Sequence, residues 1–318
     1  MSHDPTLSRF VLQGRWRFQQ VIGRGADGTV YLAKDERAGT PVAVKVYDSL
    51  IGKHGARVRE KIAEEAQVAR AVTSPHLVQV LDWGVAPAEG GAEAGFIVME
   101  YLEGEPLRDV LERRRAPMPL DDVVRILRGV LRAVASLHDN GYLHRDLKPE
   151  NVFVLRQPQG EVAVKLFDLG AIRSVEQAHV GAARGTPLYV APEVARRAGR
   201  IGRQSDVYST GVMLYELLVG RPPVADHATP AQIVAQHVYG QLDALPPEWS
   251  AAAIGDVYRR ATARDPSRRY RDASAFERAL GQLAPAANQL LPSPSAFSST
   301  VTDDSVVGAL PPFVPPGS

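Results

Sequence analysis

The fold is decided by residues 144–151, which read HRDLKPEN, and by residues 165–170, which read KLFDLG. Both runs adjoin short apolar stretches that suit β-strands, so their polar residues are expected on loops at strand ends. Asp146, Asn151 and Asp168 then bring two carboxylates and an amide together. Such a cluster can supply a general base and the hard oxygen ligands that Mg²⁺ prefers.

Two further motifs lie upstream of this cluster. Residues 23–30 read GRGADGTV between two expected strands, and glycines let backbone N–H groups approach phosphate oxygens closely. A strand follows the last glycine, whereas a dinucleotide-binding fold would open a helix there. Residues 42–45 read VAVK, and Lys45 could neutralise phosphate charge beneath the glycine loop. Taken alone, the first motif could be an ordinary turn and Lys45 a surface lysine.

In this order the motifs resemble the signature set of the protein kinase family, and specifically the eukaryotic-like serine/threonine kinases of bacteria. The resemblance includes an Ala-Pro-Glu triplet at 191–193 and covers roughly residues 16–283. It implies an α+β, bilobal protein kinase fold with a β-rich N-lobe, one main N-lobe helix and a mainly helical C-lobe. The expected divisions are an N-terminal extension at 1–15, the N-lobe at 16–101, the C-lobe at 102–283 and a Pro/Ser-rich, disordered tail at 284–318.

Hydrophobic periodicity agrees with this division. Residues 16–46 alternate as twisted antiparallel strands do, and residues 56–73 carry apolar side chains at helical spacing. Two more strands are expected at 76–84 and 95–103, with a Gly/Ala-rich loop at 85–95. The C-lobe pattern predicts helices around 122–141, 206–219, 230–239, 249–263 and 272–283, and short strands at 152–155 and 162–167.

The resemblance assigns the residues around ATP. Lys45 would hold the α- and β-phosphates and would be oriented by a glutamate of the 56–73 helix. Glu64 and Glu65 are the candidates for this glutamate, and the pattern EEAQVARAV favours Glu65. The phosphates would lie under Gly23, Gly25 and Gly28. The adenine site is expected to include Ile22, Val30, Ala43, the gatekeeper Met99, and the hinge residues Glu100 and Leu102.

The same resemblance assigns the residues of the transfer step. Asp146 would accept the proton of the substrate hydroxyl, and Lys148 would contact the γ-phosphate. Asn151 and Asp168 would hold Mg²⁺, or Mn²⁺ in its place. Lys148, two positions after Asp146, and the Gly-Thr-Pro at 185–187 are typical of kinases that phosphorylate serine and threonine in proteins.

Three other matches concern structural support. Asp206 is expected to brace the catalytic loop, and Glu193 is expected to pair with Arg269 as a buried ion pair. Leu169 stands where the family usually has phenylalanine, and it can serve as the same apolar plug behind Asp168.

Regulation is less typical of the family. Arg145 usually accompanies control by phosphate on the activation segment, yet residues 171–185 contain a single hydroxyl, Ser174. Ser174 and Thr186 are the candidate regulatory residues. We hypothesise weak dependence on phosphorylation, with Glu176 supplying the anion. Loss of activity in Ser174→Ala, without any effect of Glu176→Gln, would contradict this hypothesis.

Composition excludes several other classes of protein. The chain has no cysteine, which rules out disulfides, zinc–thiolate sites and cysteine nucleophiles. With 37 basic and 36 acidic residues, the formal net charge of +1 does not favour nucleic acid or a membrane surface as a partner. The sequence shows no secretory signal and no apolar run long enough to cross a bilayer, so a cytoplasmic location is expected.

Three functions are compatible with a sequence of this kind. The leading one is an ATP-dependent kinase acting on Ser/Thr hydroxyls of protein substrates, including itself, with a transient homodimer as one route to autophosphorylation. The alternative is a pseudokinase that acts as an ATP-binding scaffold, but such proteins commonly lose one of the polar residues that this chain retains. Small-molecule phosphotransferases of similar fold lack the Lys-Pro-Glu-Asn continuation and the Ala-Pro-Glu segment, which both occur here.

Overall fold

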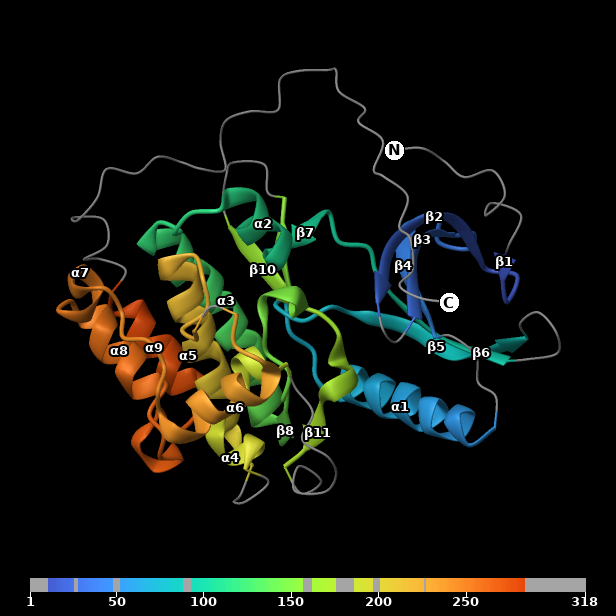
Figure 1. Ribbon diagram of the computed structural model, residues 1–318. Coiled ribbons are helices and arrows are strands. Elements are labelled where there is room, and N and C mark those ends of the chain that lie inside the picture. The colour runs from blue at the N-terminus through green and yellow to red at the C-terminus, as the bar shows by residue number, and fades with distance from the viewer. Residues whose placement is uncertain are drawn as a thin grey trace.

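The computed structural model describes most of the chain as two lobes, a β-rich one and a helical one (Figure 1). This arrangement confirms the expected α+β bilobal fold. The described ranges are 11–25, 28–47, 52–87, 93–156, 162–175, 186–196, 201–225 and 227–283. The side chains of a few residues within them, including Glu65 and Leu169, lie outside the description, as do the predicted tail at 284–318 and residues 1–10.

The N-lobe is built on one six-stranded antiparallel sheet with the strand order β1-β2-β3-β4-β6-β5. The strands are β1 (Val11–Leu12), β2 (Trp16–Gly25), β3 (Gly28–Asp35), β4 (Pro41–Tyr47), β5 (Val80–Pro87) and β6 (Glu93–Glu100). The predicted loop at 85–95 is therefore wrong in extent, because Val85 pairs with Gly95 and Pro87 pairs with Glu93. Ala86 is buried against the sheet core, so small residues extend the strands here instead of ending them.

The sheet begins before residue 16. Strand β1 pairs with the start of β2, and Arg15 forms an ion pair of 2.7 Å with the buried Asp35. The hydrogen bond from Arg15 is the main reason that the pKa of Asp35 falls to about 2, against the opposing effect of burial. Strand β1 and the turn that joins it to β2 therefore belong to the N-lobe.

The two faces of this sheet bury separate apolar clusters. One face carries a core that includes Trp16, Val44 and Phe96. The other face packs Tyr47 and Ile97 against Ile62 of helix α1 (Gly52–Ala71), which lies along the sheet near β5 and β6 (Figure 1). Helix α1 is thereby held beside the strand that carries Lys45.

The C-lobe contains most of the helices and two small sheets. Its helices are α2 (Leu107–Arg114), α3 (Leu120–Asp139), α4 (Pro192–Ala195), α5 (Arg203–Val219), α6 (Pro230–Tyr239), α7 (Pro247–Ser250), α8 (Ala253–Ala261) and α9 (Ala273–Gly281). Its strands are β7 (Gly104–Pro106), β8 (Tyr142–Leu143), β9 (Val152–Leu155), β10 (Ala163–Leu166) and β11 (Arg173–Ser174). Short 3₁₀ turns are η3 (Pro149–Asn151), η4 (Leu169–Ala171), η6 (Pro187–Tyr189) and η7 (Pro266–Arg268).

The predicted helix at 249–263 is in fact two helices, α7 and α8. The backbone of Ala252 is extended, and the chain turns so tightly that a Cβ at Gly255 would lie 2.5 Å from the carbonyl oxygen of Ser250. Two helical segments can approach this closely only where the side chain is absent.

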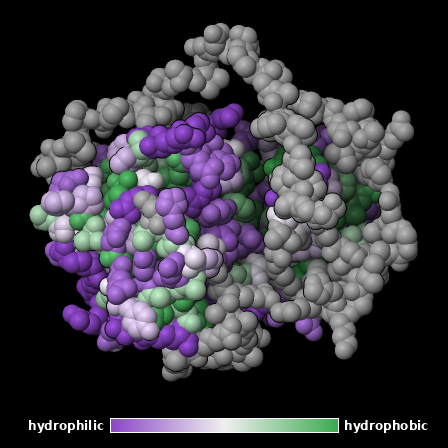
Figure 2. Space-filling model, in the orientation of Figure 1, coloured by the Kyte–Doolittle hydropathy of each residue, from purple (hydrophilic) through white to green (hydrophobic). Residues whose placement is uncertain are grey.

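Helices α3 and α5 form the centre of the C-lobe. Helix α5 is buried over most of its length and has apolar residues on all sides, as expected for a core helix. Helix α3 packs against β10 so closely that a Cβ at Gly129 would lie 2.4 Å from Val164. Hydrophilic side chains predominate on the C-lobe face visible in Figure 2. Among the described helices, none combines the length and the apolar character needed to cross a membrane.

We expect His237 to make the fold sensitive to acid. The ring is 1% exposed, its Nδ1 lies 2.8 Å from the Tyr208 hydroxyl, and burial lowers its pKa to about 4. An unfolded chain binds this proton near a pKa of about 6.5, so stability falls as the pH drops from about 7 towards 4. This histidine should account for a loss of about 2 kcal/mol between pH 7.5 and pH 5.

Urea unfolding at these two pH values, in the wild type and in His237→Gln, measures this contribution. Glutamine keeps a polar partner for Tyr208 but does not titrate. The variant should therefore lose less stability on acidification, and an unchanged pH dependence would contradict the assignment.

Candidate active site

The glycine-rich motif forms the turn between β2 and β3. Gly25 and Gly28 are paired at the ends of the two strands, while Ala26 and Asp27 lie outside the described residues. Gly28 has φ +148°, and a Cβ there would lie 2.1 Å from the carbonyl oxygen of Val46. Only glycine fits this position, which brings the hairpin end close to β4. Gly23 lies opposite Val30 within the same hairpin.

Lys45 extends from β4 towards the C-lobe. Its Nζ lies 3.1 Å from Oδ1 of Asp168 and 5.1 Å from the centre of the Tyr47 ring. Val30 is its neighbour on β3 and Ile97 its neighbour on β6. The structure thus joins the lysine of the VAVK strand to the aspartate of the DLG triplet, although 123 residues separate them.

Helix α1 contacts the activation segment through Glu64. Its carboxylate lies 3.1 Å from the guanidinium of Arg173 on β11, an ion pair that the sequence did not predict. Glu65 belongs to the same helix, but its side chain lies outside the described residues. Glu64 therefore has an ion-pair partner on β11, and the pairing of Glu65 with Lys45 stays a prediction.

The Asp146 carboxylate is held by three neighbouring residues. Lys148 Nζ lies 2.7 Å from Oδ2, and the Asn151 side-chain amide donates to the Asp146 carbonyl oxygen at 2.8 Å and to Oδ2 at 3.3 Å. The Thr186 backbone N–H donates to Oδ1 at 3.2 Å, and Lys148 Nζ also lies 3.1 Å from Thr186 Oγ1. Residues from the catalytic loop and from the end of the activation segment therefore meet at one carboxylate.

Asp168 lies at a sharp backbone turn. Its φ is +60°, in the left-handed region that most side chains avoid but aspartate tolerates. The preceding residue, Phe167, is tied to the catalytic loop because its N–H donates to the Asn151 carbonyl oxygen at 3.0 Å. This backbone contact fixes Asp168 beside Asn151.

Asp206 stabilises the backbone of the catalytic loop, as the sequence predicted. Its carboxylate accepts the backbone N–H groups of His144 and Arg145, each at 2.9 Å, and lies 2.9 Å from His138 Nε2. Burial alone would raise the pKa of Asp206, but the hydrogen bond from His138, the nearby histidines and the Arg145 N–H hold that pKa below its usual range. Burial also lowers the pKa of His144.

The residues predicted for the adenine site lie on facing strands and on the segment that joins the lobes. Ala43 of β4 pairs with Met99 of β6, and Ala43 is 8% exposed. Ile22 is 41% exposed at the irregular part of β2. The Glu100 side chain points elsewhere: it accepts a hydrogen bond from the Gln79 N–H at 2.8 Å and pairs with Lys165 Nζ at 2.5 Å. Any role of Glu100 in the predicted adenine site would therefore fall to its backbone.

The sequence also matches a family model. The model described as "Protein kinase domain" covers residues 16–279. This chain belongs to the protein kinase family.

Several curated kinases are similar to it. Serine/threonine-protein kinase pkn2 of Myxococcus xanthus is 39% identical over 71% of this chain and 27% of its own length. Serine/threonine-protein kinase Pkn1 of the same organism is 34% identical over 88% of this chain and 39% of its own. Serine/threonine-protein kinase PknL of Mycobacterium tuberculosis is 38% identical over 86% and 67%, respectively. The chain thus spans from 27% to 67% of the length of these relatives.

The predicted support for the kinase activation segment is present. Arg269 donates to both carboxylate oxygens of Glu193, at 2.8 and 2.9 Å, and its side chain is 0% exposed. Ser205 Oγ donates to the same carboxylate at 2.8 Å. The pair joins α4 to the segment after η7, which confirms the predicted Glu193–Arg269 interaction.

Sequence reasoning missed a second, partly buried network of the kinase domain. Arg108 of α2 contacts Glu150 of the catalytic loop at 3.1 Å, Glu216 of α5 at 2.8 Å and the Tyr189 hydroxyl at 2.6 Å. Tyr189 in turn donates to Glu216 at 2.6 Å, and burial together with this carboxylate raises its pKa. The members are 27 to 108 residues apart, so no local pattern could have grouped them.

The candidate regulatory residues occupy different surroundings. Ser174 is half-buried on β11 and pairs with Tyr142 of β8. Thr186 lies against Asp146 and Lys148, where a phosphate would face the Asp146 carboxylate. Glu176, the proposed internal anion, lies outside the described residues.

Proposed function

We propose that this domain transfers the γ-phosphoryl group of ATP to serine and threonine hydroxyls of proteins, its own included. The observation that carries the proposal is the Asp146 carboxylate, held by Lys148, Asn151 and Thr186. The three relatives are all named serine/threonine-protein kinases, which supports the choice of acceptor.

A protein kinase domain uses ATP and a divalent metal ion, and the residues present suit both. The side-chain nitrogen of Asn151 donates to Asp146, which leaves the side-chain oxygen of Asn151 for a cation. Asp168 adds a carboxylate that is 34% exposed. Hard oxygen donors of this kind favour Mg²⁺, with Mn²⁺ as a substitute. When bound, the nucleotide and ion supply the transferable phosphoryl group and neutralise its negative charge.

The protein's own contribution is positioning and charge. Asp146 would orient the acceptor hydroxyl and take its proton, while Lys148 would bring positive charge to the transferring phosphoryl group. Lys148 is already anchored between Asp146 and Thr186, so little rearrangement is needed. Lys45, directed by Glu65, would hold the other phosphates close to Asp168.

The remaining assignments are part of the same proposal. A cytoplasmic location and a transient homodimer during autophosphorylation belong to it, as do Ser174 and Thr186 as regulatory residues. The adenine and phosphate contacts would come from Ile22, Gly23, Gly25, Gly28, Val30, Ala43, Met99, Glu100 and Leu102. The alternative of an ATP-binding scaffold without transfer has no observation in its favour, because Lys45, Asp146, Asn151 and Asp168 are all retained.

The acceptor class can be tested directly. The full chain is incubated with ATP, Mg²⁺ and a generic protein acceptor, and the modified residues are mapped by mass spectrometry. Phosphate on serine or threonine supports the proposal. Phosphate found only on tyrosine, or only on an added aminoglycoside or other small hydroxyl compound, would contradict it.

The choice between Glu65 and Glu64 leads to a separate prediction. Glu65→Gln should lower kcat/KM for ATP by about 10²-fold, because Lys45 loses the group that orients it. Glu64→Gln, which breaks only the half-exposed pair with Arg173, should change it by less than about threefold. Steady-state kinetics with varied ATP distinguish the two, and the reverse order of effects would exchange the assignments.

A further inference from the structure

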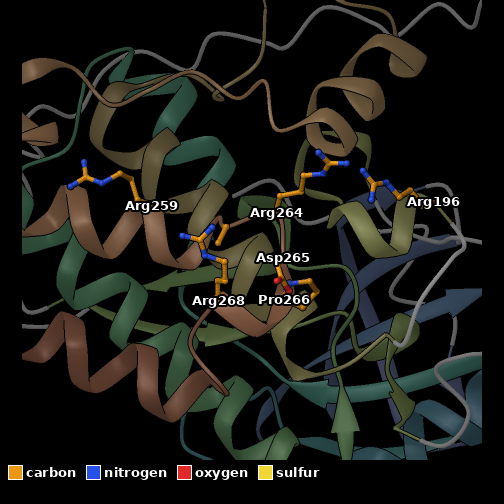
Figure 3. Close-up of a pocket in the computed structure, with 7 residues that line it drawn as sticks. Arg196, Arg259, Arg264, Asp265, Pro266 and Arg268 are labelled. Carbon is orange, nitrogen blue, oxygen red and sulfur yellow. The ribbon is translucent and has the colours of Figure 1, made fainter.

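A basic pocket lies on the C-lobe surface where α4, the end of α8 and η7 meet. It has a volume of about 600 Å³ and shares no lining residue with the active site. Its lining includes Arg196, Arg259, Arg264, Asp265, Pro266 and Arg268 (Figure 3). The side chains of all four arginines are exposed, so they are available to a ligand.

The positive charges of this pocket are only partly compensated. Arg259 pairs with Asp256, whereas Arg196 donates to the carbonyl oxygen of Val238, a neutral acceptor. Within the described ranges, the Arg264 guanidinium forms no hydrogen bond or ion pair. Asp265 is the one acidic residue among the lining residues, and its Oδ1 is already bound by the backbone and hydroxyl of Ser267.

The arrangement of the arginines favours an extended acidic ligand. In Figure 3 the side chains of Arg196 and Arg264 extend towards each other, while Arg259 and Arg268 lie on the other side of Asp265. Two like charges that face each other repel, and an anion between them removes that repulsion. Because the charges lie on two sides, a segment with more than one carboxylate can engage both.

The chain itself carries a segment of this kind. The tail from 284 to 318 contains Asp303 and Asp304 and neither lysine nor arginine. It follows Leu283, just after α9, and α9 packs against α8. Twenty extended residues reach about 66 Å, so Asp303 can reach the pocket. A tether of this length gives an effective concentration in the millimolar range, which lets a weak, exposed site be occupied.

We propose that this pocket binds the Asp303–Asp304 segment of the chain's own C-terminal tail. This binding function is separate from phosphate transfer, and it gives the basic surface a ligand within the same molecule.

The absence of cysteine makes the test direct. Cysteines are introduced at Ser305, beside the two aspartates, and at Ala263, which lines the pocket. The control pairs Ser305→Cys with Arg278→Cys, on the exposed surface of α9 close to the start of the tail. If the tail did not bind the pocket, the cysteine at position 305 would approach position 278 at least as often as position 263. Faster disulfide formation with Ala263→Cys than with Arg278→Cys therefore indicates docking.

We expect the pocket pair to form its disulfide at least about tenfold faster than the control pair, at a rate independent of protein concentration. Arg264→Glu with Arg268→Glu should reduce the rate to that of the control, and Asp303→Lys with Asp304→Lys should restore it in that background. Salt at about 0.5 M should reduce the difference.

Equal rates for the pocket and control pairs would overturn the proposal. So would a rate that rises with protein concentration, since the segment would then come from a second molecule. A difference that survives charge reversal would show that charge does not hold the tail and would equally overturn it. Thermal unfolding of each variant shows whether the surface substitutions leave the fold intact.

Discussion

Replacing Asp146 with asparagine should lower the rate of phosphate transfer by about 10²- to 10⁴-fold, the usual contribution of a general base. Asparagine has nearly the same shape, and its one side-chain oxygen can still accept the hydrogen bond from Lys148 or the one from the Thr186 N–H. It cannot take the proton of an acceptor hydroxyl. The affinity for ATP should therefore change little, because Asp146 is not among the residues assigned to the nucleotide.

Two measurements are needed, namely single-turnover transfer at saturating ATP and equilibrium binding of ATP. Asp139→Asn, an exposed substitution at the end of α3, is the matched control and should leave both unchanged. Transfer at the wild-type rate in Asp146→Asn would show that another group is the base. An equal loss of transfer and of ATP binding would indicate a structural role.

Replacing Arg269 with methionine should destabilise the domain by about 3–5 kcal/mol, which is typical when one partner of a buried ion pair is removed. Among the described residues, Glu193 would keep Ser205 as the one hydrogen-bond partner of its buried carboxylate. Arg269 also donates to the carbonyl oxygens of Ala263 and Gln204, which would lose these hydrogen bonds. Desolvation of the unpaired groups, more than the lost attraction, causes the cost.

Urea unfolding of the wild type and the variant measures this effect. Arg268→Met is the neighbouring control, and because its side chain is exposed it should change stability by less than about 0.5 kcal/mol. In a double variant with Glu193→Gln, the loss should be smaller than the sum of the single losses. A loss below about 1 kcal/mol in Arg269→Met would contradict the buried-pair account.

The fold and the centre of the site could be predicted because their signals are local. The HRDLKPEN and KLFDLG runs each place several polar residues within a few positions, and the structure brings Asp146, Asn151 and Asp168 into one region. Alternation and helical periodicity located most strands and helices. They failed at 85–95, where alanine and glycine hide strand pairing, and at 249–263, where tight packing at Gly255 breaks a helix.

The supporting contacts could not be predicted, because they join distant parts of the chain. His138 had no role in the sequence analysis, yet it contacts Asp206 across 68 residues. Lys165 pairs with Glu100, and Arg173 pairs with Glu64. Nothing in the sequence around these charged residues indicates that they form ion pairs. Such pairs depend on how the lobes and the activation segment pack, which periodicity does not report.

The most direct test of the central claim separates transfer from binding. The purified full chain is incubated with γ-labelled ATP and Mg²⁺, and protein-bound label and ATP-dependent thermal stabilisation are measured on the same sample. An active kinase incorporates label on serine or threonine, and the incorporation disappears in Asp146→Asn while the stabilisation remains. Stabilisation by ATP without any incorporated label, in the wild type and with a protein acceptor present, would contradict the proposed function and identify an ATP-binding scaffold.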